Sequence, residues 1–242
     1  MYQQIVVLTG AGISAGSGLS TFRDENGLWE DHHIEDVATP EGYQRDPNQV
    51  ERFYNARRQQ FLMSEIVPNE GHIALAYLEQ ASAGELLIVT QNIDDLHERA
   101  GSKKLVHMHG ELAKGRCPGS GQTFTLNAPF GVDNTCTCCI PGQRLRPHVV
   151  WFGEIPLGLS RIQQALARCD LFIAVGTSGT VYPAAGFVEL AKHHGAQTVE
   201  VNLLPPSANS QFQYHLQGKA SDVLPQLIEG ILQGKPLSEL SR

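Results

Sequence analysis

The glycine-rich segment Gly10–Gly16, with the sequence GAGISAG, directly follows the apolar run Ile5–Leu8. A buried strand that ends in such a turn is typical of a dinucleotide site, because glycine backbone can approach a pyrophosphate and a helix N-terminus can meet its charge. In hydride-transferring dehydrogenases an acidic residue about 20 residues further on, at the end of a second strand, binds the ribose. The corresponding window 26–33 has no strand pattern. We therefore expect a nucleotide that is held in a different way.

Amide and carboxylate side chains follow a second apolar run, in the segment Gln91–Asp94. These groups can hydrogen-bond a ribose or an uncharged carboxamide. Asp94 alone is equally suited to capping a helix that begins near Asp95. Its combination with Asn92 favours a binding role.

Two histidines, His107 and His109, follow a third run and would share one face of a strand. His109 precedes Gly110, which allows a ligand or backbone to come close, and the pKa of histidine suits a general base. The alternative is a hydrogen-bonded core histidine. We assign the base to His109 and the structural role to His107.

Tyr54 and Arg57 lie three residues apart on a helix predicted around 50–62, and hence on one face of it. A phenol and a bidentate guanidinium together suit a carboxylate ligand. The alternative for this pair is a solvated helix face.

Four of the five cysteines lie between Cys117 and Cys139. Structural zinc needs four tetrahedral ligands, commonly from two C-x2-C knuckles. Cys136 and Cys139 form one knuckle, but Ser120 stands where the partner of Cys117 is expected. The site then has three cysteines with water, recruits Cys138, or holds no metal; packed or free thiols are the alternative.

Apolar runs that read as buried strands alternate with helical patterns along most of the chain, which predicts an α/β fold with a doubly wound parallel sheet. The expected strands are 5–8, 86–89, 105–108, 149–152, 171–175 and 198–201, and the expected helices are 72–80, 160–168, 184–194 and 223–232. In such a sheet the residues after each strand meet at one edge. These are Gly10–Gly12, Thr90–Asp94, His109–Gly110, Gly176–Ser178 and Asn202.

Two segments interrupt the alternation, and we expect them to form a small domain with a helical and a zinc-ribbon-like module. They are 26–69 and 113–146, which leaves 1–25, 70–112 and 147–242 for the Rossmann-like domain.

The 242 residues carry a net charge of -7, which argues against nucleic acid as a partner. No apolar run approaches the roughly 18 residues of a membrane span, and the N-terminus does not read as a signal peptide. We expect a cytoplasmic monomer without membrane attachment.

The motifs GAGIS, TFRDENGLW, TQNID, HMHGEL, the cysteine knuckles, VVWFGE and GTS occur in this order from Gly10 to Ser178. Together they resemble the sirtuins over nearly the whole chain. EDVATPEGY, FYNARR and RPHVVWFGE are similar to the bacterial CobB-type enzymes of the class III branch.

The resemblance implies an NAD-dependent lysine deacylase that releases nicotinamide, free lysine and O-acyl-ADP-ribose, with acylated lysine-containing proteins as partners. His109 is then the catalytic base, and Cys117, Cys136 and Cys139 hold structural Zn²⁺. Tyr54 and Arg57 bind the carboxylate of a malonyl or succinyl group, in a pocket that Ala38 leaves roomy. Val150, Phe152, Gly153 and Glu154 form a strand edge to which the substrate peptide adds. NAD is implied to contact Gly10, Ala11, Gly12, Ser14, Thr21, Phe22, Arg23, Trp29, Gln91, Asn92, Ile93, Asp94, Gly176, Thr177, Ser178, Asn202 and Ala220.

Three other functions fit parts of the sequence. A nicotinamide-dependent oxidoreductase is disfavoured by the missing ribose acid. A non-catalytic NAD-sensing module is disfavoured by His109 together with Asn92. Mono-ADP-ribosyl transfer to protein is the third.

Overall fold

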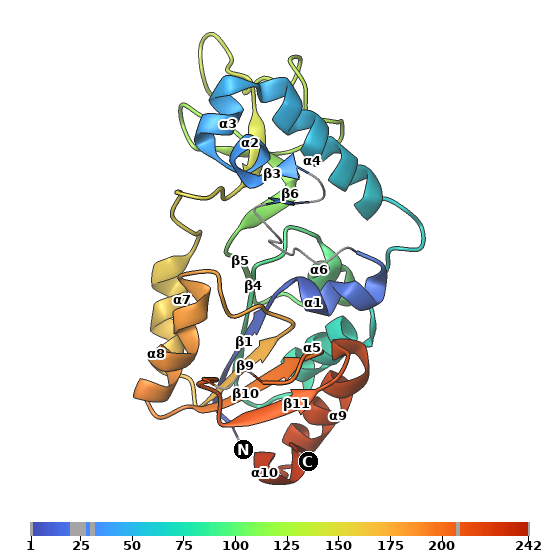
Figure 1. Ribbon diagram of the computed structural model, residues 1–242, viewed down its shortest axis with the longest axis vertical. Helices are drawn as coiled ribbons and strands as arrows, with labels where there is room; N and C mark the ends of the chain where they lie inside the picture. Colours follow the sequence, from blue (N-terminus) through green and yellow to red (C-terminus); the bar gives the residue numbers. More distant parts are fainter. Residues whose placement is uncertain (1, 20–27, 30–31, 207–208, 242) are drawn as a thin grey trace.

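A computed structural model describes residues 2–19, 28–29, 32–206 and 209–241. Its main element is a six-stranded parallel sheet in the order β11-β10-β9-β1-β4-β5 (Figure 1). The strands are β1 (Gln4–Thr9), β4 (Glu85–Thr90), β5 (Leu105–His107), β9 (Leu171–Val175), β10 (Gln197–Asn202) and β11 (Tyr214–Gln217). The expected α/β fold with a parallel sheet is confirmed.

Helices cover both faces of this sheet because its strands are apolar on both sides. Along β1, Ile5 and Val7 belong to the core cluster under α5 (Glu70–Ala81) and α9 (Ala220–Leu232). Val6 and Leu8 belong to the opposite cluster, under α7 (Leu159–Leu166) and α8 (Phe187–His193). The alternation follows from the two-residue period of a strand, and it produces the doubly wound arrangement. The short α10 (Leu237–Leu240) packs against α9.

The order in which strands are added to the sheet reverses at β1. It passes from β1 to β4 and β5, and then returns to β9 on the other side of β1. In open α/β sheets, ligands bind beyond the carboxyl ends of the strands at such a switch point. The short α1 (Ala11–Ser14) and a 3-10 turn (Ala15–Ser17) begin there.

A smaller module lies above the carboxyl edge of the sheet (Figure 1). It contains α2 (Ile34–Val37), α3 (Pro40–Arg45), α4 (Pro47–Phe61) and a three-stranded antiparallel sheet of β7 (Thr123–Thr125), β6 (Gly110–Arg116) and β8 (Arg146–Val149). Thr39 and Asp46 cap α3 and α4, and each cap is followed by proline at the first helical position. A short pair of strands, β2 (Leu28–Trp29) and β3 (His32–His33), precedes α2. The division of the chain into domains remains a prediction.

Three predicted elements differ from the structure. The expected strand 149–152 is wrong, because β8 ends at Val149, and Glu154 closes a turn by accepting the Trp151 N–H at 2.8 Å. The expected helix 184–194 is divided into a 3-10 turn (Ala184–Gly186) and α8. The edge strand β11 was not predicted, since its sequence YHLQ alternates polar and apolar residues over only four positions.

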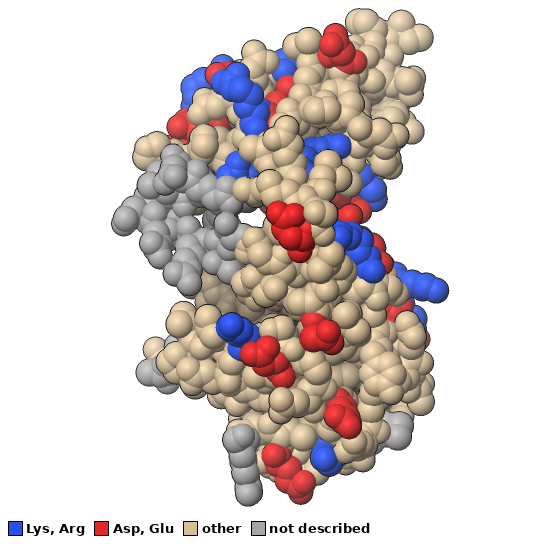
Figure 2. Space-filling model, turned by 90° about the vertical axis from the view of Figure 1, so that its right-hand side faces the viewer, with Lys and Arg blue, Asp and Glu red and all other residues tan. Residues whose placement is uncertain are grey.

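Acidic and basic side chains are interspersed on the face of the molecule shown in Figure 2. Among the described residues, no helix has the length and apolar character needed to cross a membrane.

Candidate active site

The glycines that open the candidate nucleotide site are required by contacts between two loops. The Gly12 N–H donates to the Gly176 carbonyl at 2.9 Å, and a Cβ atom at Gly12 would lie 2.6 Å from the Gly176 Cα. Gly176 itself has a φ of +60°, which favours glycine. The loop after β1 and the loop after β9 therefore meet through backbone alone, which places 10–14 beside 176–178.

Ser14, Asn92 and Asp94 form one buried network below this loop contact. The Asn92 Nδ2 group donates to the Gly10 carbonyl and to Ser14 Oγ, both at 3.1 Å, and Ser14 Oγ donates to Asp94 Oδ2 at 3.0 Å. Burial raises the pKa of Asp94, whereas hydrogen bonds from Leu96 and Ser14 oppose that rise. The network fixes the loop after β4 against the loop after β1.

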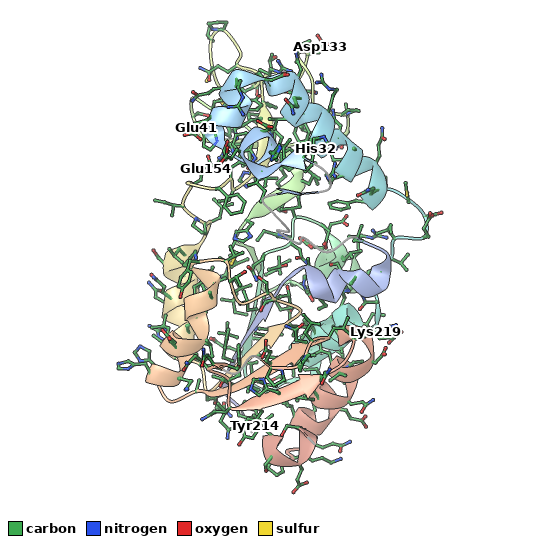
Figure 3. All side chains as sticks on the ribbon, viewed as in Figure 1. His32, Glu41, Asp133, Glu154, Tyr214 and Lys219 are labelled. Carbon is green, nitrogen blue, oxygen red and sulfur yellow. The ribbon has the colours of Figure 1, made fainter. Side chains whose placement is uncertain are left out.

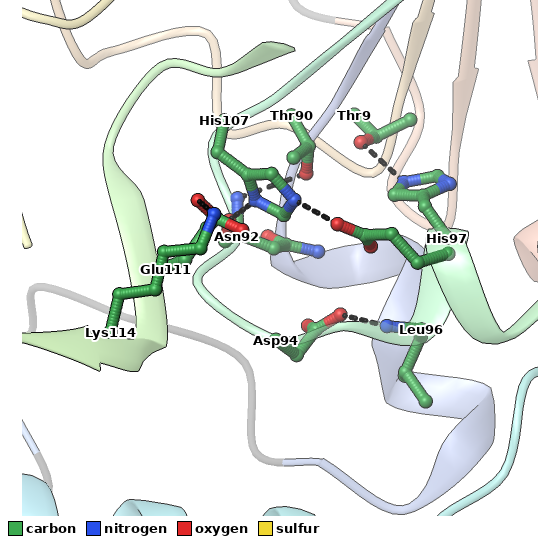
Figure 4. A network of polar contacts seen from close by, with 10 residues as sticks. Thr9, Thr90, Asn92, Asp94, Leu96, His97, His107, Glu111 and Lys114 are labelled. Carbon is green, nitrogen blue, oxygen red and sulfur yellow. Dashed lines mark hydrogen bonds and ion pairs between the residues drawn. The ribbon is translucent and has the colours of Figure 1, made fainter. Parts of the chain in front are cut away.

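Asp94 contacts both the start of a helix and the glycine-rich loop, while its expected role in NAD binding stays a prediction. Its Oδ1 accepts the Leu96 N–H at 3.1 Å at the start of α6 (Leu96–Ala100), although the N-cap residue itself is Asp95 (Figure 4). Its other oxygen accepts from Ser14. One carboxylate thus starts the helix and orders the glycine-rich loop.

His109 lies in the turn between β5 and β6, because β5 ends at His107; the expected strand position of His109 is wrong. Its Nδ1 lies 3.1 Å from the Gln91 carbonyl oxygen. Since a carbonyl only accepts hydrogen bonds, Nδ1 carries the proton and Nε2 is the nitrogen that can accept another. Burial lowers the pKa of His109, against the opposing effect of the Gln91 bond. The ring is therefore neutral at pH 7, as a general base requires.

Gly110 allows another part of the chain to come close, as expected, and the group that approaches it is the backbone of His148. With a φ of +85°, it lies where a Cβ would come within 2.0 Å of the His148 carbonyl oxygen. The Val150 N–H then donates to the His109 carbonyl at 2.8 Å. These contacts join His109 to the segment 150–154.

The remaining nucleotide-site candidates lie along the same edge. The Asn202 side chain donates to the Thr177 carbonyl at 2.9 Å, and Ser178 is exposed beside them. Ala220 begins α9. Gln91 donates its N–H to the Thr9 carbonyl, and the Ile93 carbonyl accepts from Leu112. Thr21, Phe22, Arg23 and the side chain of Trp29 lie outside the described residues.

The segment Val150–Glu154 has much of its backbone engaged within the chain. The Phe152 N–H donates to the Ala38 carbonyl at 2.9 Å, and the amides of Trp151 and Glu154 close the turn between those two residues. A peptide strand that adds here would pair with carbonyl oxygens of this segment or with the Gly153 amide, which is not among these donors. The Phe152 side chain is exposed, which suits contact with a substrate.

Glu154, labelled in Figure 3, forms ion pairs with two arginines of the small module. Arg146 donates to both of its oxygens, at 2.7 and 3.0 Å, and Arg116 donates to one at 3.2 Å. These charges lower the pKa of Glu154 against the opposing effect of burial. The contacts give Glu154 a structural role at the turn.

Tyr54 and Arg57 are buried on α4, so the alternative of a solvated helix face is wrong. Tyr54 is fully buried, and its hydroxyl accepts the Trp151 indole N–H at 3.0 Å. Arg57 is 7% exposed; its guanidinium lies over the Phe53 ring at 3.8 Å and donates to the Phe53 carbonyl. Burial lowers the pKa of Arg57 to about 10, which leaves it charged at pH 7.

One apolar cluster connects this helix to the rest of the site. Ala38, Tyr54 and Trp151 pack together in it, and the partly buried Ile93 packs against it. Ile93 lies between Asn92 and Asp94 in the chain. Trp151 was not proposed from the sequence as a site residue. In an extended segment its side chain points to the opposite side from those of Val150 and Phe152, and this could have indicated that it is buried.

The sulfur atoms of Cys117, Cys136, Cys138 and Cys139 lie within 4.8 Å of one another. The Ser120 hydroxyl lies 3.0 Å from Cys138 Sγ, and the Ser120 and Gln143 amides donate to Cys117 and Cys136. Four thiols at this separation match the ligand number and chemistry of tetrahedral zinc. The position of Cys138 therefore allows it to be the fourth thiol in place of Ser120.

The Sir2 family profile matches residues 10–183 of the chain. A protein of Shewanella oneidensis named NAD-dependent protein deacylase is 70% identical over 235 residues, which are 97% of this chain and 97% of that protein. The chain belongs to the Sir2 family. Two solved Sir2 structures share its fold. A Sir2 homologue in complex with NAD has a TM-score of 0.83 at 36% identity, covering 96% of this chain and 91% of that one. Sir2Tm bound to a propionylated peptide has a TM-score of 0.77 at 28% identity, covering 94% and 93%. The parallel sheet with its small module is thus the Sir2 fold.

Proposed function

We propose that this protein is an NAD-dependent protein deacylase that removes succinyl and malonyl as well as acetyl groups from lysine side chains. The deacylase activity itself follows from Sir2 membership and from the closely similar deacylase of Shewanella oneidensis. The preference for acyl groups that end in a carboxylate is the finer part of the proposal. One observation carries it: Arg57 is a buried cation on α4, one helical turn from Tyr54, whose hydroxyl contacts Trp151.

The acyl end of the substrate would lie between α4 and the segment that follows β8. A guanidinium can donate two parallel hydrogen bonds to a carboxylate, and burial reduces the competition from water for such a contact. Ala38, with only a methyl side chain in the same cluster, leaves space for a four-carbon acyl group. The Tyr54 hydroxyl accepts the Trp151 N–H in this cluster, which places a phenol on the same side of α4 as the guanidinium.

NAD would lie along the carboxyl edge between the loops after β1, β4 and β9. A Sir2 homologue of the same fold forms a complex with NAD, which supports NAD as the ligand, and the switch point of the sheet supports this edge as its site. The acyl carbonyl oxygen attacks the anomeric carbon of the nicotinamide ribose, and nicotinamide leaves. Nε2 of His109 then takes a proton from a ribose hydroxyl, whose oxygen attacks the acyl carbon. Water finally releases free lysine and O-acyl-ADP-ribose.

We further propose that Cys117, Cys136, Cys138 and Cys139 hold a structural zinc ion. The close grouping of the four sulfurs supports this ligand set. When bound, zinc would crosslink the loops beside β6 and β8. The ion would have no part in the reaction, because the cysteines lie in the small module and away from His109.

The expected setting of the enzyme remains part of the proposal. All five cysteines are free of disulfides, which fits the reducing cytoplasm. The net charge of -7 suits lysine-rich protein segments as substrates and disfavours nucleic acid. We propose that the protein acts as a monomer.

The test is to incubate the protein with NAD and matched acetyl-, malonyl- and succinyl-lysine peptides. Mass spectrometry should find free lysine peptide, nicotinamide and the corresponding O-acyl-ADP-ribose in each reaction. Deacylation of the acetyl peptide alone would contradict the proposed acyl range. ADP-ribose attached to protein would instead support mono-ADP-ribosyl transfer.

A further inference from the structure

Two histidines hold successive carbonyl groups of the loop after β4. His109 Nδ1 contacts the Gln91 carbonyl at 3.1 Å, and His107 Nδ1 contacts the Asn92 carbonyl at 3.3 Å. Asn92 is thereby fixed from both ends, since its side chain donates to Gly10 and Ser14. His107 therefore contacts the expected NAD site through the backbone of one of its central residues.

The two histidines differ at their second nitrogen. His107 Nε2 lies 2.7 Å from Glu98 Oε1 on α6, and the His107 side chain is 10% exposed (Figure 4). A carbonyl and a carboxylate both accept hydrogen bonds, so both nitrogens of His107 must donate. His107 is thus an imidazolium, whereas His109 keeps a nitrogen ready to accept a proton.

The surroundings of His107 support the charged form. Burial alone would lower its pKa, but Glu98 and Glu111 outweigh that effect and raise it. A cavity of about 430 Å³ lies beside the ring, so protons can reach it from solvent. The charged and titratable groups that face the ring or line this cavity are Asp94, His97, Glu98, Lys103, Glu111, Lys114 and Arg161.

We propose that the Glu98–His107 pair is a positioning device for the NAD-binding loop: the imidazolium, held by the Glu98 carboxylate, fixes the Asn92 carbonyl and with it the Asn92 and Asp94 side chains. The proposal rests on the proposed function for its consequence in catalysis. Loss of one proton leaves a neutral ring with a single N–H, which can no longer donate to both Glu98 and the Asn92 carbonyl, and this loosens the loop. NAD affinity therefore falls as pH rises through the titration of His107.

Glu98→Gln tests this device, because it keeps the shape of the side chain and removes the charge that holds the proton. NAD affinity, measured by calorimetry, should be about tenfold weaker than in the wild type at pH 8, the scale of one charge-assisted hydrogen bond, and should recover at pH 6. Glu111→Gln is the matched control, since it removes a nearby carboxylate that pairs with Lys114. It should produce a clearly smaller change.

His107→Gln provides the conservative variant. Its amide can donate to the Asn92 carbonyl but does not titrate, so its NAD affinity should lose the alkaline dependence seen in the wild type. A purely structural role would weaken binding equally at all pH values. An equal affinity of wild type and Glu98→Gln at pH 6 and pH 8 would overturn the proposal.

The protonation state can be read without any activity. Two-bond ¹H–¹⁵N correlation spectra of the wild type should show both His107 nitrogens protonated at pH 7 and His109 neutral. A neutral His107 in that spectrum would overturn the proposal, even where Glu98→Gln fails to fold. Absence of deacylation with a charged His107 would instead contradict the proposed function alone.

Discussion

The two ends of the candidate site are built from different material. At the carboxyl edge of the parallel sheet, the loops 10–14, 91–94 and 176–178 interlock through glycines, carbonyls and short polar side chains. On α4, the contacts are made by large side chains, and Tyr54 and Arg57 are packed against aromatic rings. Backbone contacts tolerate little change, whereas a side chain on a helix can be exchanged. From this comparison we expect that the chemistry and the proposed choice of acyl group can be changed separately.

Substitution at the sheet edge should have the largest effect and should not discriminate among acyl groups. We expect His109→Gln to lower deacylation of every acyl-lysine peptide by about 10²- to 10⁴-fold, the usual contribution of a general base. NAD binding should persist, and nicotinamide exchange should survive in part. Steady-state kinetics and calorimetry measure these effects, with the exposed His193→Gln as control. Turnover within a few fold of wild type would remove His109 from the mechanism.

Substitution of Cys138 tests whether the small module requires a fourth thiol to bind zinc. Cys138→Ser should reduce bound zinc from about one equivalent to a small fraction and lower the melting temperature, because structural zinc contributes directly to folding. Cys169→Ala removes the cysteine outside the cluster and should leave the zinc content unchanged. Full zinc occupancy in Cys138→Ser, measured by atomic emission, would show that the other three cysteines suffice.

Acid should destabilise the fold beneath the sheet edge. His72 and His97 are fully buried, and burial lowers their pKa values to about 4 and about 3. Below pH 6.5 the unfolded chain binds protons that the folded protein excludes, so stability falls as pH drops toward 4 and is unaffected by this pair above 6.5.

From pH 6.5 to pH 5 this loss should amount to about 3 kcal/mol for the two histidines together. Urea unfolding at both pH values measures it. His72→Gln should halve the dependence on pH, and an unchanged slope in that variant would exclude His72 as a cause.

The smallest expected effect concerns the hydroxyl of Tyr54. Tyr54→Phe leaves the buried Trp151 indole N–H without its acceptor, which should cost about 1 to 3 kcal/mol of stability. Desuccinylation should fall a few fold more than deacetylation. Denaturant unfolding and peptide kinetics measure the two effects. Equal losses for both substrates would confine Tyr54 to packing.

Much of the sheet edge was predictable because it follows from local sequence. Buried strands are short apolar runs, and polar residues after them must meet at one edge, which identified Asn92, Asp94 and His109. The strand expected at 149–152 failed for a physical reason: Val149 and Trp151 are buried in the small module, whereas Phe152 is exposed. An apolar run alone does not show which of its side chains are buried and which are exposed.

Side-chain contacts between segments far apart in the chain could not be predicted from the sequence. The Trp151–Tyr54 bond joins residues 97 apart, and the contact of Cys138 with Ser120 depends on how two loops fold over each other. The structural role expected for His107 stays a prediction, and its carboxylate partner on α6 could not be named from the sequence. Such contacts depend on tertiary structure, which residue types and spacing do not specify.

The most direct test of the separation between chemistry and acyl choice is the ratio of kcat/KM for succinyl-lysine to that for acetyl-lysine in Arg57→Met. An Arg–carboxylate contact in a buried site is worth about 1.5 to 3 kcal/mol, so the ratio should fall by about tenfold to a hundredfold, while deacetylation stays within a few fold of wild type. Arg52→Met, on the exposed side of α4, should leave the ratio unchanged. A parallel fall of both activities in Arg57→Met would contradict the account and show that Arg57 supports the fold of the module.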